Sequence, residues 1–393
     1  MKFDFDKVID RRNTHSSKWD AMGIATGATS HDAIAMWVAD MDFEAPPAVR
    51  EALQEEVDRL TLGYYANDIT WREAMSEWLD RHHGYKPDPA WITPTSGIGS
   101  ALGLILQAFS DEGDAVIVFS PAYHAFYKYI KANNRELVTQ SMEQVDGQYR
   151  MDLDALQKSL PKNAKVVFFC SPHNPGGRVW DKQEILDLVA FCEKNDLILV
   201  SDEIHNDLVF PGATHHVTHK IAPEAGDRIV TCVGATKTFN LAGAHIGGAI
   251  ISDAKMRKRF VDICQRSGLL SFPLMGMIAT EAAQRHGDEW LAELLPYLQT
   301  NRDLLAERIK KAIPGARPMH LQSTYLGWVN FTDTPIPYDE VMKRITKDAR
   351  VGASNGPQFG PGGENWVRFN FATPRTIVDE AMNRIDEAFN DIA

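Results

Sequence analysis

Residues 166–202 read VVFFCSPHNPGGRVWDKQEILDLVAFCEKNDLILVSD, and this stretch decides the class of fold. It opens with the apolar run 166–170 and closes with a second one at 197–200, both typical of strands buried on two faces. Between them, residues 182–194 carry apolar side chains at helical spacing. A strand, a helix and a strand in succession predict two parallel strands joined by a covering helix.

The same alternation extends outward along the chain and predicts an α/β fold with a mostly parallel sheet covered on both faces. The further predicted strands are residues 115–119, 229–233 and 246–251, and the further predicted helices are residues 101–109, 122–131 and 256–266.

After residue 272 the pattern changes, because two helices follow each other and the later strands alternate in polarity. The predicted elements are helices 273–285, 288–312, 338–347 and 376–390 and strands 325–331 and 366–371. We therefore predict a smaller α+β domain at the C-terminus. The glycine- and proline-rich loop 356–363 is expected to be mobile unless it lines a site.

Composition restricts the possible partners. The 393 residues carry a formal net charge of −12, which argues against duplex DNA or an anionic membrane as the partner, although local basic patches stay possible. No apolar stretch approaches the roughly 20 residues of a membrane helix. The four cysteines are scattered without a C-x-x-C pair, and the first residues show no secretory leader, so we expect a reducing, cytoplasmic location.

Candidate chemistry lies just after the buried strands, where open α/β sheets bind ligands. Ser96, Gly97 and Ile98 lead into a helix expected to begin near Ser100, so they could cradle a phosphate, or could form only a glycine turn. The third glycine of a dinucleotide fingerprint is missing there, since residue 102 is Leu102.

Two charged residues follow later strands. Asp202 is expected at the end of a buried strand, where its carboxylate needs a cationic partner, unless it only caps a turn. Lys237 is either an ordinary surface lysine or a desolvated nucleophile. Pyridoxal 5'-phosphate (PLP) explains the set, because it needs a Schiff-base lysine, a carboxylate for its ring nitrogen, an anion cradle and a polar group near its ring oxygen. Lys237, Asp202, the turn at 96–98 and Asn174 match these needs.

These residues stand in longer motifs that resemble a known family. Across essentially the whole length, the chain resembles the fold-type I PLP enzymes of the class I and II aminotransferase family, and most closely its MalY/PatB branch of cystathionine (cysteine-S-conjugate) β-lyases. The matching motifs are FDFD at residue 3 with Arg11, SKWD at 17, MWVADMDF at 36, GYY at 63, SPAY at 120, SPHNPGGRVW at 171, SDEIH at 201, TKTFNLAG at 236 and WVRFN at 366.

The resemblance implies a seven-stranded sheet in a large domain over residues 47–286, a small domain formed by residues 1–46 and 287–393, and a role for each matching residue. Lys237 would form the Schiff base and move the Cα proton, Asp202 would pair with the pyridinium nitrogen, and Asn174, together with His205, would bind the ring oxygen. Tyr123 would stack on the pyridine ring, and the phosphate would be bordered by Ser96, Gly97, Ile98 and Thr236. Tyr64 would reach the phosphate of the partner subunit, which implies a homodimer with shared active sites. Arg368 would bind the substrate α-carboxylate, and the substrate side chain would lie near Ala39 and Asp40.

The phosphate site departs from the aminotransferase pattern. His245 stands eight residues after Lys237, where an arginine is typical, and Gly234 stands where a serine is common. The site is therefore less cationic, which fits the lyase branch. The doublets His82-His83 and His215-His216 lack the spacing of a zinc motif, so no metal is expected.

The sequence thus predicts a PLP-dependent carbon–sulfur β-lyase that converts cystathionine or a related conjugate to a thiol, pyruvate and ammonia. An aminotransferase would use the same residues and is the nearest alternative. A non-catalytic regulatory or binding protein on the same fold is the second alternative, disfavoured by the presence of both Lys237 and Asp202.

Overall fold

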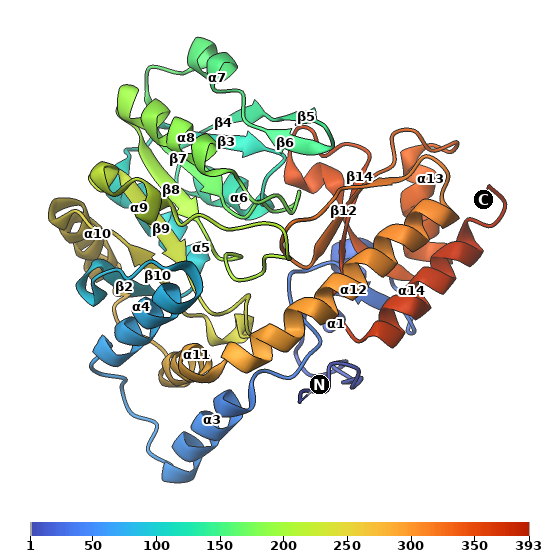
Figure 1. Ribbon diagram of the computed structural model, residues 1–393, viewed down its shortest axis with the longest axis horizontal. Coiled ribbons are helices and arrows are strands. Elements are labelled where there is room, and N and C mark those ends of the chain that lie inside the picture. Colours follow the sequence, from blue (N-terminus) through green and yellow to red (C-terminus); the bar gives the residue numbers. More distant parts are fainter. Residues whose placement is uncertain (1, 393) are drawn as a thin grey trace.

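The computed structural model describes residues 2–392 and contains two main sheets (Figure 1). The larger sheet has seven strands, of which only β10 runs antiparallel to the others. Its spatial order is β2 (Ile92–Thr95), β10 (Gly247–Ile250), β9 (Ile229–Val233), β8 (Ile198–Asp202), β7 (Ala164–Cys170), β3 (Ala115–Ser120) and β4 (Glu136–Ser141). The predicted mostly parallel, seven-stranded α/β sheet is confirmed.

Helices cover both faces of this sheet, because its central strands are apolar on both sides. On one face, α5 (Ile98–Phe109), α6 (His124–Ala132) and α10 (Ala254–Arg266) pack side chains such as Phe126 and Phe260 against the sheet. On the other face, α8 (Lys182–Lys194) buries Ile185 and Leu188. The remaining large-sheet helices are α3 (Pro47–Arg59), α4 (Ile69–His83), α7 (Leu153–Ser159), α9 (Thr218–Ile221) and α11 (Leu274–His286).

The smaller sheet joins the two ends of the chain. Its order is β1 (Ile34–Met36), β13 (Val351–Asn355), β14 (Trp366–Asn370), β12 (Leu326–Asn330) and β11 (Arg317–Pro318), and β1 pairs in parallel with β13. The long helix α12 (Asp288–Ala312) and the last helix α14 (Arg375–Ala388) pack together beside it (Figure 1). This pairing supports the division into residues 47–286 and residues 1–46 plus 287–393, which stays a prediction.

The predicted elements match the observed ones best where the apolar pattern is strong. Strand 229–233 and helices 182–194 and 288–312 have the expected bounds, whereas α5 begins at Ile98 rather than near Ser100. The predicted helix 338–347 is α13 (Tyr338–Lys343) continued by a wider π-turn at Arg344–Asp348. Strands β1, β2, β4 and β11 and the hairpin of β5 (Glu143–Val145) and β6 (Gln148–Arg150) were not predicted, because they are short, lie at edges or contain proline. Strand β13 was not predicted because its sequence VGASN is rich in residues that are uncommon in strands.

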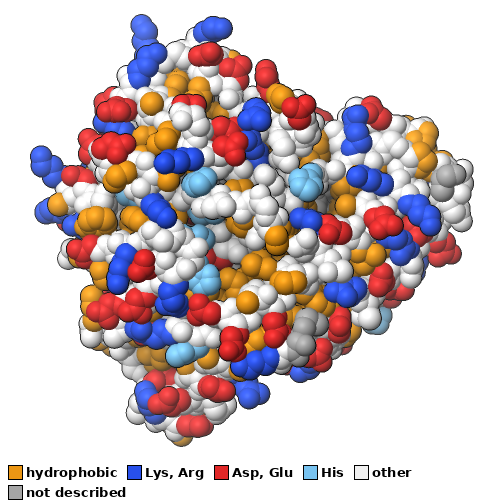
Figure 2. Space-filling view, viewed as in Figure 1, with side chains coloured by type: hydrophobic (Ala, Val, Ile, Leu, Met, Phe, Trp, Pro, Cys, Tyr) orange, Lys and Arg blue, Asp and Glu red, His pale blue; other side chains and the backbone are white. Residues whose placement is uncertain are grey.

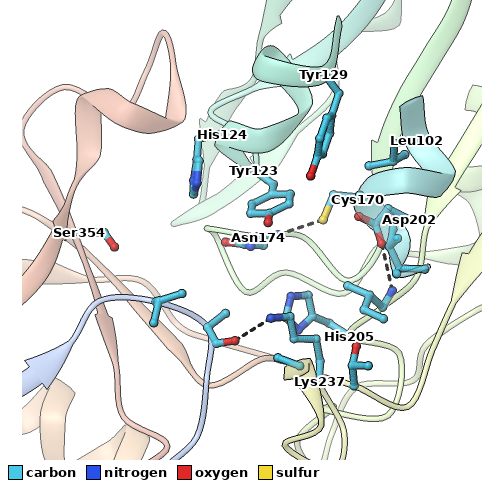
Figure 3. Close-up of a pocket in the computed structure, with 18 of the residues that line it drawn as sticks. Leu102, Tyr123, His124, Tyr129, Cys170, Asn174, Asp202, His205, Lys237 and Ser354 are labelled. Carbon is cyan, nitrogen blue, oxygen red and sulfur yellow. Dashed lines mark hydrogen bonds between the residues drawn. The ribbon is translucent and has the colours of Figure 1, made fainter. Parts of the chain in front are cut away.

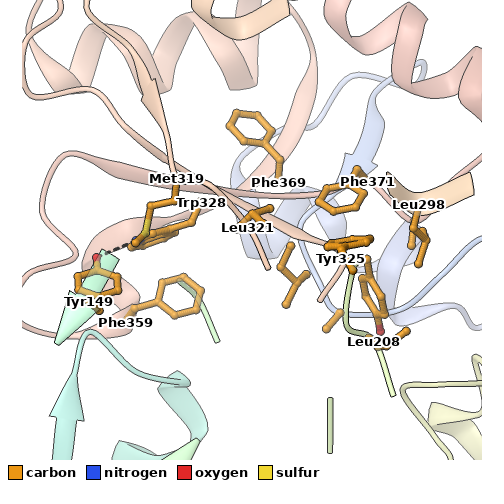
Figure 4. Close-up of a cluster of buried hydrophobic side chains, with 14 of the residues drawn as sticks. Tyr149, Leu208, Leu298, Met319, Leu321, Tyr325, Trp328, Phe359, Phe369 and Phe371 are labelled. Atoms are coloured by element: carbon orange, nitrogen blue, oxygen red, sulfur yellow. Dashed lines mark hydrogen bonds between the residues drawn. The ribbon is translucent and has the colours of Figure 1, made fainter. Parts of the chain in front are cut away.

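A continuous apolar cluster links the two sheets (Figure 4). Trp328 of the small sheet donates its indole N–H to the hydroxyl of Tyr149, which lies on β6, at 3.0 Å. Trp328 also stacks on Trp366, with ring centroids 5.1 Å apart and planes inclined by 11°. The large side chains of both parts therefore form one core, and this core fixes the small sheet against the carboxyl edge of the large one.

The surface fits a chain with mixed charge. Figure 2 shows acidic and basic side chains interspersed over the visible face, without one large basic field. Among residues 2–392, no helix combines the length and apolarity required to cross a membrane.

Candidate active site

One cavity of about 530 Å³ lies where the carboxyl edge of the large sheet meets the small sheet (Figure 3). It gathers every predicted site residue except Tyr64 and Asp40: Ala39, Ser96, Gly97, Ile98, Tyr123, Asn174, Asp202, His205, Thr236, Lys237 and Arg368. Tyr64 lies outside the cavity, and its side chain is 96 % exposed in the single chain.

Strand register brings three of these residues together. Strands β7, β8 and β9 are parallel neighbours, with Cys170 opposite Asp202 and Asp202 opposite Cys232. Asn174 and Lys237 each follow the end of their strand within a few residues, so all three side chains reach the same edge of the sheet. The parallel order of the sheet thus explains why residues far apart in sequence share one cavity.

Asp202 is a buried carboxylate without a cation in contact. Its Oδ1 accepts the amide of Ile204 at 3.2 Å, and no ion pair within residues 2–392 includes it. Burial raises the pKa of Asp202 to about 7, although the amide of Ile204 and the charge of Lys237 both act to lower it. A buried carboxylate that lines a cavity in this way is suited to a cationic ring nitrogen.

Lys237 points into the cavity from the loop after β9. Its Nζ donates to the backbone carbonyl of Ala39 at 2.6 Å (Figure 3). Burial lowers the pKa of Lys237 to about 8, while the Asp40 and Asp202 carboxylates raise it and Arg368 lowers it further. A lysine whose amine is neutral in a substantial fraction near neutral pH can act as a nucleophile and as a base.

The opposite end of the cavity offers backbone donors to an anion. Gly97, with φ of 79°, precedes α5, and no side chain caps the first turn of this helix. A Cβ added at Gly97 would lie 3.9 Å from Nδ1 of His245, so His245 lies beside this turn and lines the cavity with Thr236. A helix N-terminus with uncapped amides is a general anion site.

Arg368 on β14 brings the small sheet to the cavity. Its Nη1 donates to Oδ1 of Asn174 at 2.9 Å and its Nη2 donates to the carbonyl of Trp37 at 2.9 Å, while its Nε is buried without a partner. The guanidinium lies 4.7 Å from the ring centre of Phe359, and burial lowers its pKa to about 10. The amide oxygen of Asn174 is thereby occupied, which leaves its NH₂ group as the donor.

Two further predicted residues lie in the cavity wall. Tyr123 precedes α6, and Figure 3 shows its ring beside Asn174; burial raises the pKa of Tyr123 to about 12. His205 is buried next to Lys237 with Nδ1 unpartnered, and burial lowers its pKa to about 3, so its imidazole is neutral. Both rings are therefore uncharged at neutral pH.

Sequence reasoning missed several cavity residues. Trp37 and Ser354 line the wall beside Arg368, and the only sequence signal was the position of Trp37 in the MWVADMDF motif. His124, which directly follows Tyr123, is exposed and lines the cavity. The loop 356–363 also contributes Gln358 and is attached to the large part, since Tyr127 and the amide of Ala122 donate to the carbonyl of Phe359 at 2.7 and 2.9 Å.

The histidine doublets have structural partners. His83 contacts Asp207 at 2.8 Å, and His215 contacts Glu203 at 2.9 Å. Within residues 2–392, no group of histidine, cysteine or acidic side chains has the arrangement of a metal site.

Comparison with known proteins identifies the class. The sequence model of the family described as "Aminotransferase class I and II" matches residues 32–385. The chain therefore belongs to the aminotransferase class I and II family.

Individual relatives show which members of this family the chain is similar to. The chain is 35 % identical over 387 residues to cystathionine beta-lyase PatB of Bacillus subtilis, covering 98 % of this chain and all of PatB. Among solved structures, cystalysin of Treponema denticola, which contains a pyridoxal 5'-phosphate cofactor, superposes with a TM-score of 0.95 at 31 % identity over all of both chains. The PLP-bound C–S lyase of Staphylococcus hominis superposes with a TM-score of 0.90 at 29 % identity, over 98 % of each chain.

Proposed function

We propose that this protein is a PLP-dependent carbon–sulfur β-lyase that cleaves cysteine S-conjugates such as cystathionine into a thiol, pyruvate and ammonia. The observation that carries the proposal is that Asp202, Lys237 and Arg368 line one cavity in a chain similar to PatB and to solved C–S lyases. The amine of Lys237, with its lowered pKa, is suited to the cofactor aldehyde, the guanidinium of Arg368 to a substrate carboxylate, and Asp202 to a ring nitrogen.

The cavity residues fit PLP from one end to the other. Asp202 would bind the ring nitrogen, Asn174 and His205 the side of the ring oxygen, and Tyr123 the ring face. Ser96, Gly97, Ile98 and Thr236 would hold the phosphate at the uncapped turn of α5. When bound, PLP supplies an electron-withdrawing ring that stabilises negative charge at Cα of the amino acid.

The chain's own residues would then carry the proton transfers. Arg368 binds the α-carboxylate as a bidentate fork, which orients the Cα–H bond. The neutral amine of Lys237 takes the Cα proton, and the bond between Cβ and sulfur breaks with its electron pair leaving on the sulfur. The proton completes the thiol, and the released 2-aminoacrylate reacts with water to give pyruvate and ammonia.

We also propose a homodimer in which Tyr64 completes the partner's site. Tyr64 stands on a segment with unusually exposed apolar side chains, since Leu60 is 83 % and Leu62 is 67 % exposed. A second copy of this chain would cover these side chains and bring the Tyr64 hydroxyl to a phosphate. Sedimentation of wild type and Leu62→Asp checks this: a monomeric wild type would contradict it. A cytoplasmic location is part of the same proposal and is supported by four buried cysteines without disulfides.

The reaction is tested by supplying L-cystathionine to the holoenzyme and measuring pyruvate and free thiol, with glutamate formation from 2-oxoglutarate measured in parallel. We expect stoichiometric pyruvate and thiol with little amino transfer. Glutamate formation without thiol release would instead identify an aminotransferase. A panel of cysteine conjugates, with Lys237→Ala as the inactive control, would then define the leaving group that the cavity accepts.

A further inference from the structure

The segment Trp37–Phe43, which we name the strap, crosses the cavity from the N-terminal region and contains charges that the proposed reaction does not use. The carboxylate of Asp42 is 3 % exposed, and its partner Lys18 is fully buried. Their Nζ and Oδ2 atoms are 2.6 Å apart. Both residues belong to the motifs SKWD and MWVADMDF, and neither lines the cavity.

The strap is held mainly through its backbone carbonyls. Nearly every carbonyl between residues 37 and 43 accepts a side-chain hydrogen bond, although the strap beyond β1 forms no strand. The donors are Arg368 and Ser354 to Trp37, Asn370 to Val38, Lys237 to Ala39, Lys18 and Asn370 to Asp40, Arg11 to Met41 and Asn240 to Phe43, all at 2.6–2.9 Å.

Two of these donors are the cations of the active site. Arg368 is bound by the carbonyl of Trp37 at 2.9 Å and Lys237 by the carbonyl of Ala39 at 2.6 Å, only two residues further on. Arg368 comes from the small sheet and Lys237 from the large one, so the strap connects side chains of both parts. Its position affects the placement of each cation relative to the other.

Asp42 anchors the far end of the strap. Its carboxylate accepts Lys18 Nζ, the indole N–H of Trp19 at 2.9 Å and Arg11 Nη1 at 3.1 Å. Although burial opposes ionisation, Lys18, Trp19 and Arg11 together keep the pKa of Asp42 below its ordinary value. Lys18 Nζ also donates to the carbonyl of Asp40 at 2.9 Å, so the same ammonium group binds the anchor and the strap backbone.

A buried ion pair contributes little net stability, because the cost of desolvating two charges offsets most of their attraction. Apolar side chains of similar volume often stabilise a fold equally well or better. The advantage of the ion pair is directional, since charged donors fix the atoms that they bind. We propose that the Lys18–Asp42 pair positions the strap so that the carbonyls of Trp37 and Ala39 hold Arg368 and Lys237 at the spacing the substrate requires. Lys18 and Asp42 are positioning residues, and the proposal rests on this cavity being the PLP site.

The proposal has a spectroscopic consequence at Lys237. The groups that face its nitrogen are the carbonyl of Ala39, the carboxylates of Asp40 and Asp202, the guanidinium of Arg368 and the neutral ring of His205. The Ala39 carbonyl and the Asp40 carboxylate both favour a protonated nitrogen and both belong to the strap. A displaced strap would therefore lower the pKa of this nitrogen.

The test replaces the pair by apolar side chains of similar size, Lys18→Met with Asp42→Leu, in the holoenzyme. We expect a melting temperature close to that of wild type, a fall of the pH midpoint at which the absorbance of Lys237-linked cofactor changes, and a rise of KM. We also expect kcat/KM to fall about tenfold, because a small misplacement of the reacting groups lowers the rate by at least this factor. Glu44→Gln is the matched control, because Glu44 is an exposed carboxylate two residues beyond Asp42, paired with Lys7, and should change none of these quantities.

The outcomes separate positioning from simple destabilisation. A structural defect lowers the active fraction and hence kcat, without moving KM or the spectral midpoint. A well-folded double variant with wild-type KM and midpoint would overturn the proposal. If the double variant does not fold, Trp19→Phe decides, because it removes only one donor to Asp42 and should shift both quantities less in the same directions; no shift there also overturns it. The spectral midpoint does not depend on whether the holoenzyme eliminates or transfers the amino group, so this test can fail while the lyase proposal stands.

Discussion

Two walls of the same cavity are built in different ways. The wall that carries Asn174, Asp202 and Lys237 follows from strand register, because β7, β8 and β9 are parallel neighbours that end at one edge. The opposite wall is the strap, which has few backbone partners and is held by side chains from several distant segments. The first wall places whole side chains with the rigidity of a sheet, and the second places single carbonyl oxygens.

The difference teaches which changes each wall tolerates. Replacing a functional side chain on the sheet edge should remove its chemistry and leave the scaffold intact, since the strands do not depend on it. Replacing a donor to the strap should leave every reacting group present but slightly misplaced.

The largest expected effect comes from the sheet wall. Lys237→Ala removes the group proposed to take the Cα proton, so we expect kcat to fall about 10⁴-fold or more. The absorbance of lysine-linked cofactor should disappear as well. Steady-state pyruvate release and the visible spectrum measure both, and retention of either at the wild-type level contradicts the role assigned to Lys237.

Asp202→Asn should have the second largest effect: it lowers turnover in the holoenzyme and raises the stability of the cofactor-free protein above neutral pH. In the holoenzyme it should lower turnover about 100-fold, because an uncharged amide supports a protonated ring nitrogen poorly. In the cofactor-free protein, the folded-state pKa of Asp202 is about 7, above the ordinary value of 3.8, so between these two pH values the folded state binds more protons than the unfolded state. Asp202 therefore reduces the stability of the fold progressively as the pH rises from about 4 to about 7.

Thermal unfolding of cofactor-free Asp202→Asn checks the sign of this linkage. The variant should melt above wild type at pH 8, and the difference should shrink as the pH is lowered toward 4. A variant that melts below wild type at pH 8 would show that Asp202 has a stabilising partner in the cofactor-free fold.

Arg368→Lys tests the place where the two walls meet. Lysine keeps the charge but cannot bind a carboxylate as a fork while also contacting Asn174 and Trp37. Loss of one charged hydrogen bond, about 1.5–3 kcal/mol, predicts a KM for L-cystathionine raised about tenfold to a hundredfold. The kinetics of a conjugate series measure it; an equal loss in kcat at unchanged KM would count against carboxylate binding by Arg368.

Asn370→Leu weakens the strap wall alone. The amide of Asn370 donates to the carbonyls of Val38 and Asp40, both at 2.6 Å, and leucine of similar size leaves them with fewer donors. We expect the free energy of unfolding to fall by about 1–3 kcal/mol, together with a rise in KM of a few-fold. Urea unfolding and kinetics on the same preparation measure the two; a stability loss without any change in KM would weaken the link between strap and substrate site.

The smallest effect concerns the phosphate end. His245→Arg places a permanent cation beside the turn at Gly97, so the cofactor should dissociate a few-fold more slowly. We expect only a small effect on dissociation, because residue 245 has a φ of 51°, in the left-handed region, and an arginine does not relieve this unfavourable backbone conformation. Rates of cofactor loss on dilution measure it; an unchanged rate would mean that the phosphate does not lie beside this residue.

Much of the molecule could be predicted from the sequence. The continuous apolar runs 166–170, 197–200 and 229–233 indicated the parallel sheet, because short β-rich runs that are apolar at successive positions are typical of strands buried on both faces. Residues directly after these runs had to lie at one sheet edge, which determined Asn174, Asp202 and Lys237 as candidates before any contact was known. The motifs added Tyr123, Arg368 and the family.

Only the tertiary structure decided how the strap is held and what it touches. The bonds from Lys237 to Ala39, from Arg368 to Trp37 and from Lys18 to Asp42 join residues separated by 24 to 331 positions, and no periodicity encodes such pairs. The edge strands β2 and β4 likewise gain their definition from neighbours. The local spacing of apolar residues determines where a helix or strand forms. A hydrogen bond between a backbone carbonyl and a distant side chain, in contrast, forms only once the sheets have packed.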